Sequence, residues 1–101
     1  MKSRLELQTM LEALLGSRNV YFQPPESIKL KYPAIVYSLS DISNVHASNI
    51  THKQDKVYQL TYIDEDPDSE NVEKISKLQY CDFDRFFTSD NLNHYTFTLY
   101  Y

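Results

Sequence analysis

The last 22 residues constrain the fold most strongly, because they contain two strand-like runs joined by a short turn. The runs are YCDFDRFFT (80–88) and HYTFTLYY (94–101), and both are rich in aromatic residues and threonine. Between them lies SDNLN, a segment rich in Ser, Asp and Asn, which are common turn residues. This arrangement predicts a β-hairpin over 80–88 and 94–101, and therefore antiparallel pairing at this end of the chain.

Three more strands are predicted upstream of the hairpin. NVYFQ (19–23) is a short strand-like run that ends at two prolines. PAIVYSL (33–39) is almost continuously apolar, which is typical of a strand covered on both faces. The third strand, 56–63, alternates between its two faces. The polar segment 40–55 is predicted to protrude as an arm, either as a long loop or as two weak, twisted edge strands.

Two helices are predicted. SRLE (3–6) is a capping box, in which a serine and a glutamate three residues later satisfy free amide groups at a helix start. It begins a helix over 3–15 with a broad apolar face, and Gly16 stands where a left-handed residue ends such a helix. A second helix is predicted over 67–78, because an Asp-Pro pair is a typical helix start and apolar residues then recur every three positions.

The order of these elements predicts a single α+β domain over residues 1–101. We expect a mostly antiparallel sheet of four to five strands, with two helices packed on one face. No internal repeat, low-complexity stretch or linker divides the sequence.

The composition narrows the classes of function. The formal net charge is −4, so the chain lacks the basic surface that binds a phosphate backbone, and DNA is expected only to pass by it. The single cysteine, Cys81, cannot form an intrachain disulfide, which indicates a reducing compartment. No signal-peptide pattern and no membrane-spanning apolar run is present. We therefore expect a soluble, cytosolic chain that does not contact a membrane.

An acidic stretch, YIDEDPDSENVEKI (62–75), raises the question of a calcium or catalytic site. Three aspartates are spaced D-x-D-x-D, as in an EF-hand loop. The sixth and twelfth positions of such a loop would be Ser69 and Ile75, where an EF-hand needs glycine and glutamate. We therefore interpret the stretch as an acidic turn between a strand and a helix. Carboxylate catalysis would need a second group facing this turn, and the sequence shows no obvious one. The carboxylates of the turn are Asp64, Glu65, Asp66 and Asp68.

The histidines and the cysteine do not form a recognisable metal or catalytic motif. His46, His52 and His94 lack the spacing of zinc ligands, and Cys81 has no partner cysteine. A thiol–imidazole pair between Cys81 and His94 would need an electropositive environment, whereas several aspartates lie near this cysteine in the sequence. We expect no metal, no cofactor and no enzymatic activity.

The excess of aromatic residues near the carboxyl end is the hardest feature to explain for an isolated chain. The aromatic side chains fall on both faces of the two predicted strands, although a two-layer domain buries only one sheet face. They form either a tyrosine-rich, half-exposed sheet or a surface that another subunit covers. The residues are Tyr80, Phe83, Phe86, Phe87, Tyr95, Phe97, Tyr100 and Tyr101.

Four strings of the sequence resemble one family. They are NVYFQPPES, KLKYPAIVYSLSDI, YQLTYIDEDPDSE and DFDRFFTSDNLNHYTFTLYY. They are similar to tail terminator or tail-completion proteins, which belong to the head–tail joining proteins of long-tailed bacteriophages and related prophages. The similarity covers residues 15–101, and the arm is its least family-like part.

The resemblance implies a structural protein without a chemical site. It implies a small α+β domain that closes into a ring, typically of six copies, and it leaves open whether the isolated chain is a monomer. The ring would cap the tail tube protein, stop its polymerisation and offer the opposite face to the head–tail connector protein, while DNA passes through the middle. The protein would then lie in the neck of the virion, after assembly in the host cytoplasm.

Three groups of residues are assigned to this role as hypotheses. The subunit contact is expected to form by strand addition through sheet edges and the aromatic strand 94–101, and its residues are assigned to Tyr95, Phe97, Tyr100 and Tyr101. The arm that contacts the tube or connector is represented by Asn44, His46, Asn49 and His52. The acidic turn is expected to face the bore, where like charge keeps DNA from binding. Alternatives are a head-completion or connector ring, a small adaptor domain, and a metal-dependent hydrolase that uses the acidic turn.

Overall fold

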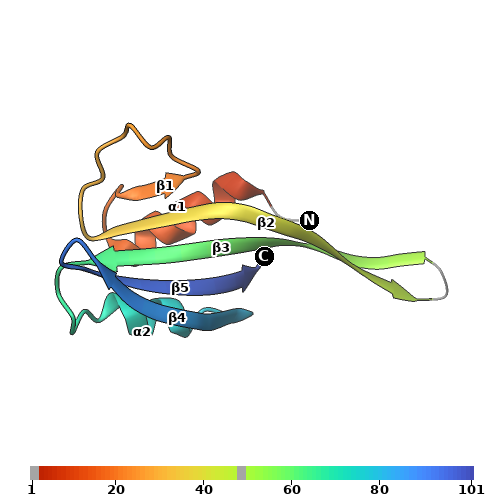
Figure 1. The fold of residues 1–101 in the computed structure, drawn as a ribbon. Helices are drawn as coiled ribbons and strands as arrows, with labels where there is room; N and C mark the ends of the chain where they lie inside the picture. The colour runs from red at the N-terminus through yellow and green to blue at the C-terminus, as the bar shows by residue number, and fades with distance from the viewer. Residues whose placement is uncertain (1–2, 48–49) are drawn as a thin grey trace.

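Five strands form one sheet that carries two helices on one face (Figure 1). This computed structural model describes the backbone of residues 3–47 and 50–101, and the side chains of 3–42 and 56–101. In chain order, the elements are α1 (Arg4–Leu15), β1 (Val20–Phe22), β2 (Ala34–Ala47), β3 (Ile50–Asp64), α2 (Asn71–Ser76), β4 (Cys81–Ser89) and β5 (Leu92–Tyr100).

The strands lie in the order β1-β2-β3-β5-β4. β1 runs parallel to β2, with Val20 opposite Ile35, and every other neighbouring pair is antiparallel. The predicted α+β class with a mostly antiparallel sheet is therefore confirmed. The predicted hairpin is present as β4 and β5, and β5 also pairs with β3. The last strand is consequently an internal strand of the sheet.

The segment predicted as an arm forms a two-stranded ribbon. β2 and β3 are longer than predicted and continue to pair with each other as far as Ala47 and Ile50. β5 pairs with β3 only as far as Val57, and β1 pairs with β2 only over 35–37. The ribbon therefore extends beyond the rest of the sheet (Figure 1), and the molecule measures 50 × 25 × 23 Å.

Helix α1 has local signals at both ends. The Oγ of Ser3 accepts a hydrogen bond from the Leu5 amide at 3.1 Å, which satisfies a free amide at the helix start. Gly16 has φ 74°, and its amide donates to the Glu12 carbonyl at 2.9 Å. This left-handed residue ends the helix because glycine adopts positive φ without a Cβ clash. Leu7 and Leu11 are fully buried beneath the sheet.

Helix α2 spans only Asn71–Ser76 and is therefore shorter than the helix predicted over 67–78. The carboxylate of Asp64 accepts a hydrogen bond from the Asp66 amide at 3.0 Å, and that of Asp66 accepts one from the Asp68 amide at 2.9 Å. Side chains of this kind hold the backbone in turns that compete with a helix. The Asp-Pro pair therefore stabilises the turn, and the helix begins after it.

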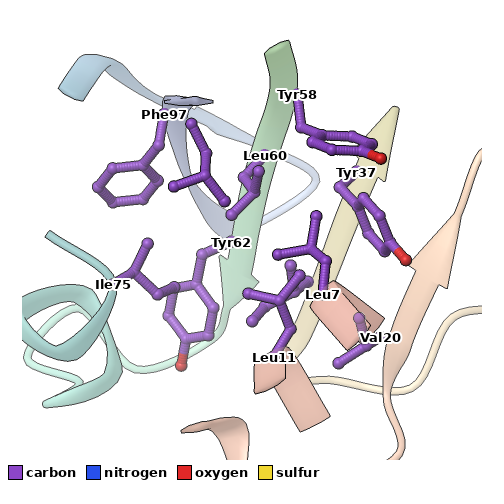
Figure 2. Close-up of a cluster of buried hydrophobic side chains, with 11 residues drawn as sticks. Leu7, Leu11, Val20, Tyr37, Tyr58, Leu60, Tyr62, Ile75 and Phe97 are labelled. Atoms are coloured by element: carbon purple, nitrogen blue, oxygen red, sulfur yellow. The ribbon is translucent and has the colours of Figure 1, made fainter. Parts of the chain in front are cut away.

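One face of the sheet and the inner sides of both helices form the core (Figure 2). The other face of the sheet carries no helix in the described part of the chain. Helices therefore cover the run 33–39 on one face only. The prediction that this strand is covered on both faces is wrong. The buried members of the core are Leu7, Leu11, Val20, Ile35, Tyr37, Tyr58, Leu60, Tyr62, Ile75, Phe97 and Leu99.

Candidate functional site: the two edges of the sheet

Strand β4 exposes large aromatic side chains at one edge of the sheet. Phe83 is 54% exposed and Phe86 is 49% exposed. In register they lie opposite Phe97 and Tyr95, and residues opposite each other share a face, so both point to the helix-bearing side. The Phe83 ring lies 5.6 Å from that of Phe97, and the Phe86 ring 5.0 Å from that of Tyr95. These phenylalanines therefore continue the core outward to a surface that the short helix α2 does not cover.

The other face of β4 carries mostly polar side chains. The carboxylate of Asp84 accepts hydrogen bonds from the Thr98 hydroxyl at 2.7 Å and from the Gln59 amide at 3.0 Å. The guanidinium of Arg85 lies 4.9 Å from the centre of the Phe87 ring. The register shifts between Phe83 and Arg85, which places a bulge on this edge strand. A bulge and charged side chains limit uncontrolled pairing of an edge with other chains.

The opposite edge, formed by β1 and the segment that links it to β2, also exposes apolar groups. Ile28 is 44% exposed and Tyr32 is 39% exposed. Lys29 and Lys31 are exposed beside them. The amide of Lys31 donates a hydrogen bond to the Tyr21 hydroxyl at 3.3 Å, so the basic part of this segment lies next to β1. This edge thus combines apolar and basic side chains.

The four residues predicted for the subunit interface do not form one surface. Phe97 is 0% exposed, so its assignment to an interface between folded copies is wrong. Strand addition through 94–101 is also wrong, because β5 already pairs with β3 and β4 along its two sides. Tyr95 and Tyr101 are half-buried, and Tyr100 is 40% exposed. Hydrophobic alternation identified the strand correctly, but it did not reveal the position of that strand in the sheet.

Phe83 and Phe86 are the surface residues that the sequence assignment missed. They stood in the same aromatic-rich set as Phe97. Simple alternation would place Phe83 and Phe86 on opposite faces, and only the bulge between Phe83 and Arg85 puts them on one face. The charged residues around them, in the string DFDRF, were the available signal of an edge, because charged residues are common on edge strands.

The acidic turn is organised around a buried tyrosine hydroxyl. Tyr62 is fully buried, and its hydroxyl donates to the carboxylate of Asp64, which is itself 8% exposed. The same oxygen accepts a hydrogen bond from the Asn71 side-chain amide at 3.1 Å and lies 2.8 Å from the Ser69 hydroxyl. Burial, and then the hydrogen bond to Asp64, raise the pKa of Tyr62 above its usual range. Asp64 is therefore an internal structural group, and its assignment to the bore is wrong.

The other members of the acidic turn, Glu65, Asp66 and Asp68, are exposed. Within the side chains that the structure describes, no cluster of three or more histidine, cysteine or carboxylate groups is suited to a metal ion. The turn therefore presents surface charge.

The residues predicted for the arm fall mostly outside the described side chains. Asn44 and His46 lie on β2 and His52 lies on β3, where only the backbone is described. Asn49 lies outside the described residues.

Cys81 and His94 do not form a thiol–imidazole pair. In the β4–β5 register, Cys81 lies opposite Leu99, whereas His94 lies opposite Phe87 and stacks on its ring at 4.7 Å. The two residues are consequently at different ends of the hairpin. Burial, and then the nearby aspartates, raise the pKa of the Cys81 thiol to about 11.

We expect Cys81 to react slowly with thiol reagents. A pKa of about 11 in place of 9.0 lowers the thiolate fraction at pH 8 by roughly 100-fold. Alkylation by iodoacetamide should therefore be about 100-fold slower in the folded chain than in the chain unfolded by guanidinium. Mass spectrometry over time measures both rates, and equal rates would contradict the buried, acidic environment of this thiol.

Among the residues that the structure describes, no helix has the length and apolar character needed to cross a bilayer. Comparison with protein-family models and with curated proteins gives no match for this chain.

Proposed function

We propose that this protein is a structural component of phage assembly, which forms a ring on the end of the tail tube and joins the tail to the head connector. The proposal rests on the resemblance of the strings NVYFQPPES and KLKYPAIVYSLSDI to tail terminator proteins. The structural observation that supports it best is the ribbon of β2 and β3, which extends away from a small sheet whose two edges expose apolar side chains.

Each part of the structure has a place in this proposal. The ribbon binds the tube. Its strands have backbone groups along their outer sides that can pair with a strand of another chain. The exposed carboxylates of Glu65, Asp66 and Asp68 face the bore, where they repel passing DNA. The edges of the sheet contact neighbouring copies. A head-side ring would use the same surfaces, so the partner that the ribbon contacts distinguishes the two roles.

Removal of the ribbon is expected to abolish tube capping without unfolding the protein. Ile42 and Lys56 are opposite each other in the β2–β3 register, so an Asn-Gly turn can join them in place of 43–55. The buried core lies outside the removed segment, and the free energy of unfolding should change by less than about 1 kcal/mol. Electron microscopy should show rings on the tube ends with the full chain and bare, still-growing tubes with the shortened one.

The experiment uses tail tubes polymerised from the tube protein of the same phage, and DNA-filled heads as the competing target. Binding of the full chain to heads but not to tubes would assign it to the head side of the joint. Equal capping by the full and shortened chains would contradict the role of the ribbon. A full chain that binds neither target would overturn the proposed function.

A further inference from the structure

We propose that copies of this chain contact each other head to tail, with the β4 edge of one copy against the β1 edge of the next. The β4 edge is defined as residues 80–90, with Phe83 and Phe86 as its apolar centre. The β1 edge is defined as residues 18–32, with Ile28 and Tyr32 as its apolar centre. The inference rests on the proposed function, since it assigns the contact that closes the proposed ring.

Both edges expose large apolar side chains that the fold leaves uncovered. Phe83 and Phe86 are each about half exposed on the face where the core lies. Ile28 and Tyr32 are exposed to a similar degree at the opposite edge of the sheet. Clustered exposed side chains of this size mark surfaces that contact other molecules. The aromatic rings are well suited to such a contact, because aromatic residues are enriched at the centres of interfaces.

The charges of the two edges are opposite. The β4 edge contains three aspartates and one arginine, a formal charge of −2. The β1 edge contains Arg18, Lys29 and Lys31 against Glu26, a formal charge of +2. All four of these β1-edge side chains are exposed. A contact between unlike edges therefore brings opposite charges together, whereas two β4 edges in a symmetric pair would repel each other.

The topology makes such a contact directional. β1 and β4 are the first and last strands in the order β1-β2-β3-β5-β4, so the two edges lie at opposite ends of one sheet (Figure 1). When two copies join through two different edges, one β1 edge and one β4 edge stay free at the two ends of the assembly. The assembly closes into a ring when the rotation between copies allows these two edges to meet. A second copy of this chain is therefore the occupant that fits both edges at once.

A charge-reversal experiment tests this pairing. In the first variant, Asp82→Lys with Thr88→Lys makes the β4 edge positive; both positions are exposed. In the second, Lys29→Glu with Lys31→Glu makes the β1 edge negative. Asp84 is left unchanged because Thr98 and Gln59 donate hydrogen bonds to it. Each variant alone now places like charges together, and should raise the concentration at which rings form by at least about tenfold.

An equimolar mixture of the two variants should restore ring formation. Each reversed edge then meets an oppositely charged edge on the other variant, and a ring with an even number of copies can alternate them. The control variant, Glu65→Lys with Asp68→Asn, raises the net charge by the same amount as the first variant, at exposed positions of the acidic turn. It should form rings like the original chain. Sedimentation velocity and electron microscopy with tail tubes count the rings, and circular dichroism checks that each variant is folded.

The outcomes separate this inference from the proposed function. Rings formed equally well by both variants, or a mixture that fails to restore them, would overturn the edge pairing while the ring itself stands. Binding of the β4 edge to the tube protein in place of a second copy would also overturn it. An unmodified chain that forms no ring, alone or on tubes, would overturn both the proposed function and the pairing.

Discussion

Replacing Phe97 by alanine is expected to lower the free energy of unfolding by about 3–5 kcal/mol. The side chain is 0% exposed, lies on the internal strand β5 and forms part of the core with residues from both helices. Its removal would leave a cavity that a rigid sheet cannot close. Because domains of this size are stable by only about 5–15 kcal/mol, this loss is a large fraction of the total stability. Urea denaturation followed by circular dichroism measures the loss.

The neighbouring phenylalanine provides the control. Phe83 contacts Phe97 edge to face at 5.6 Å, but it is 54% exposed. Phe83→Ala should therefore lower the free energy of unfolding by only about 1 kcal/mol. If the β4 edge contacts another copy, the same substitution should impair ring formation more than it impairs folding. Equal losses of stability at the two positions would contradict the assignment of one to the core and the other to the surface.

The protein is expected to lose stability in alkaline solution, with the urea midpoint falling as the pH rises above about 10. Burial raises the pKa of the hydroxyl groups of Tyr37, Tyr58 and Tyr62. In the unfolded chain a tyrosine ionises near pH 10. Above that pH the unfolded chain binds fewer protons than the folded chain, so the free energy of unfolding falls as the pH rises. Below it, the contribution of these tyrosines is fully present.

Two measurements test this explanation. Tyrosinate absorbance at 295 nm should include a phase that coincides with the loss of the circular dichroism signal, because the buried hydroxyl groups ionise only when the chain unfolds. Tyr62→Phe removes one of these groups and should weaken the pH dependence, while Tyr32→Phe controls for the loss of a hydroxyl at an exposed position. Complete ionisation of all tyrosines in a folded chain would contradict the burial of these side chains.

Much of the secondary structure was predictable from local signals. The capping serine and Gly16 marked both ends of α1, and the turn-forming residues within 89–93 marked the β4–β5 hairpin, whose turn is in fact only 90–91. These features depend on a few neighbouring residues, whose hydrogen bonds and backbone preferences do not require the rest of the fold. The second helix was misplaced because the same aspartates that favour a helix start also stabilise turns through their side chains.

The candidate interaction surface was less predictable, because exposure depends on strand order and on what covers each strand. By itself the sequence determined that 80–88 and 94–101 pair, and that aromatic residues fill both strands. Only the tertiary structure decided that β5 lies between β3 and β4, which buries Phe97, and that β4 lies at the edge, which exposes Phe83. Two phenylalanines in similar alternating patterns thus differ in role, since burial is set by neighbours that are distant in the chain.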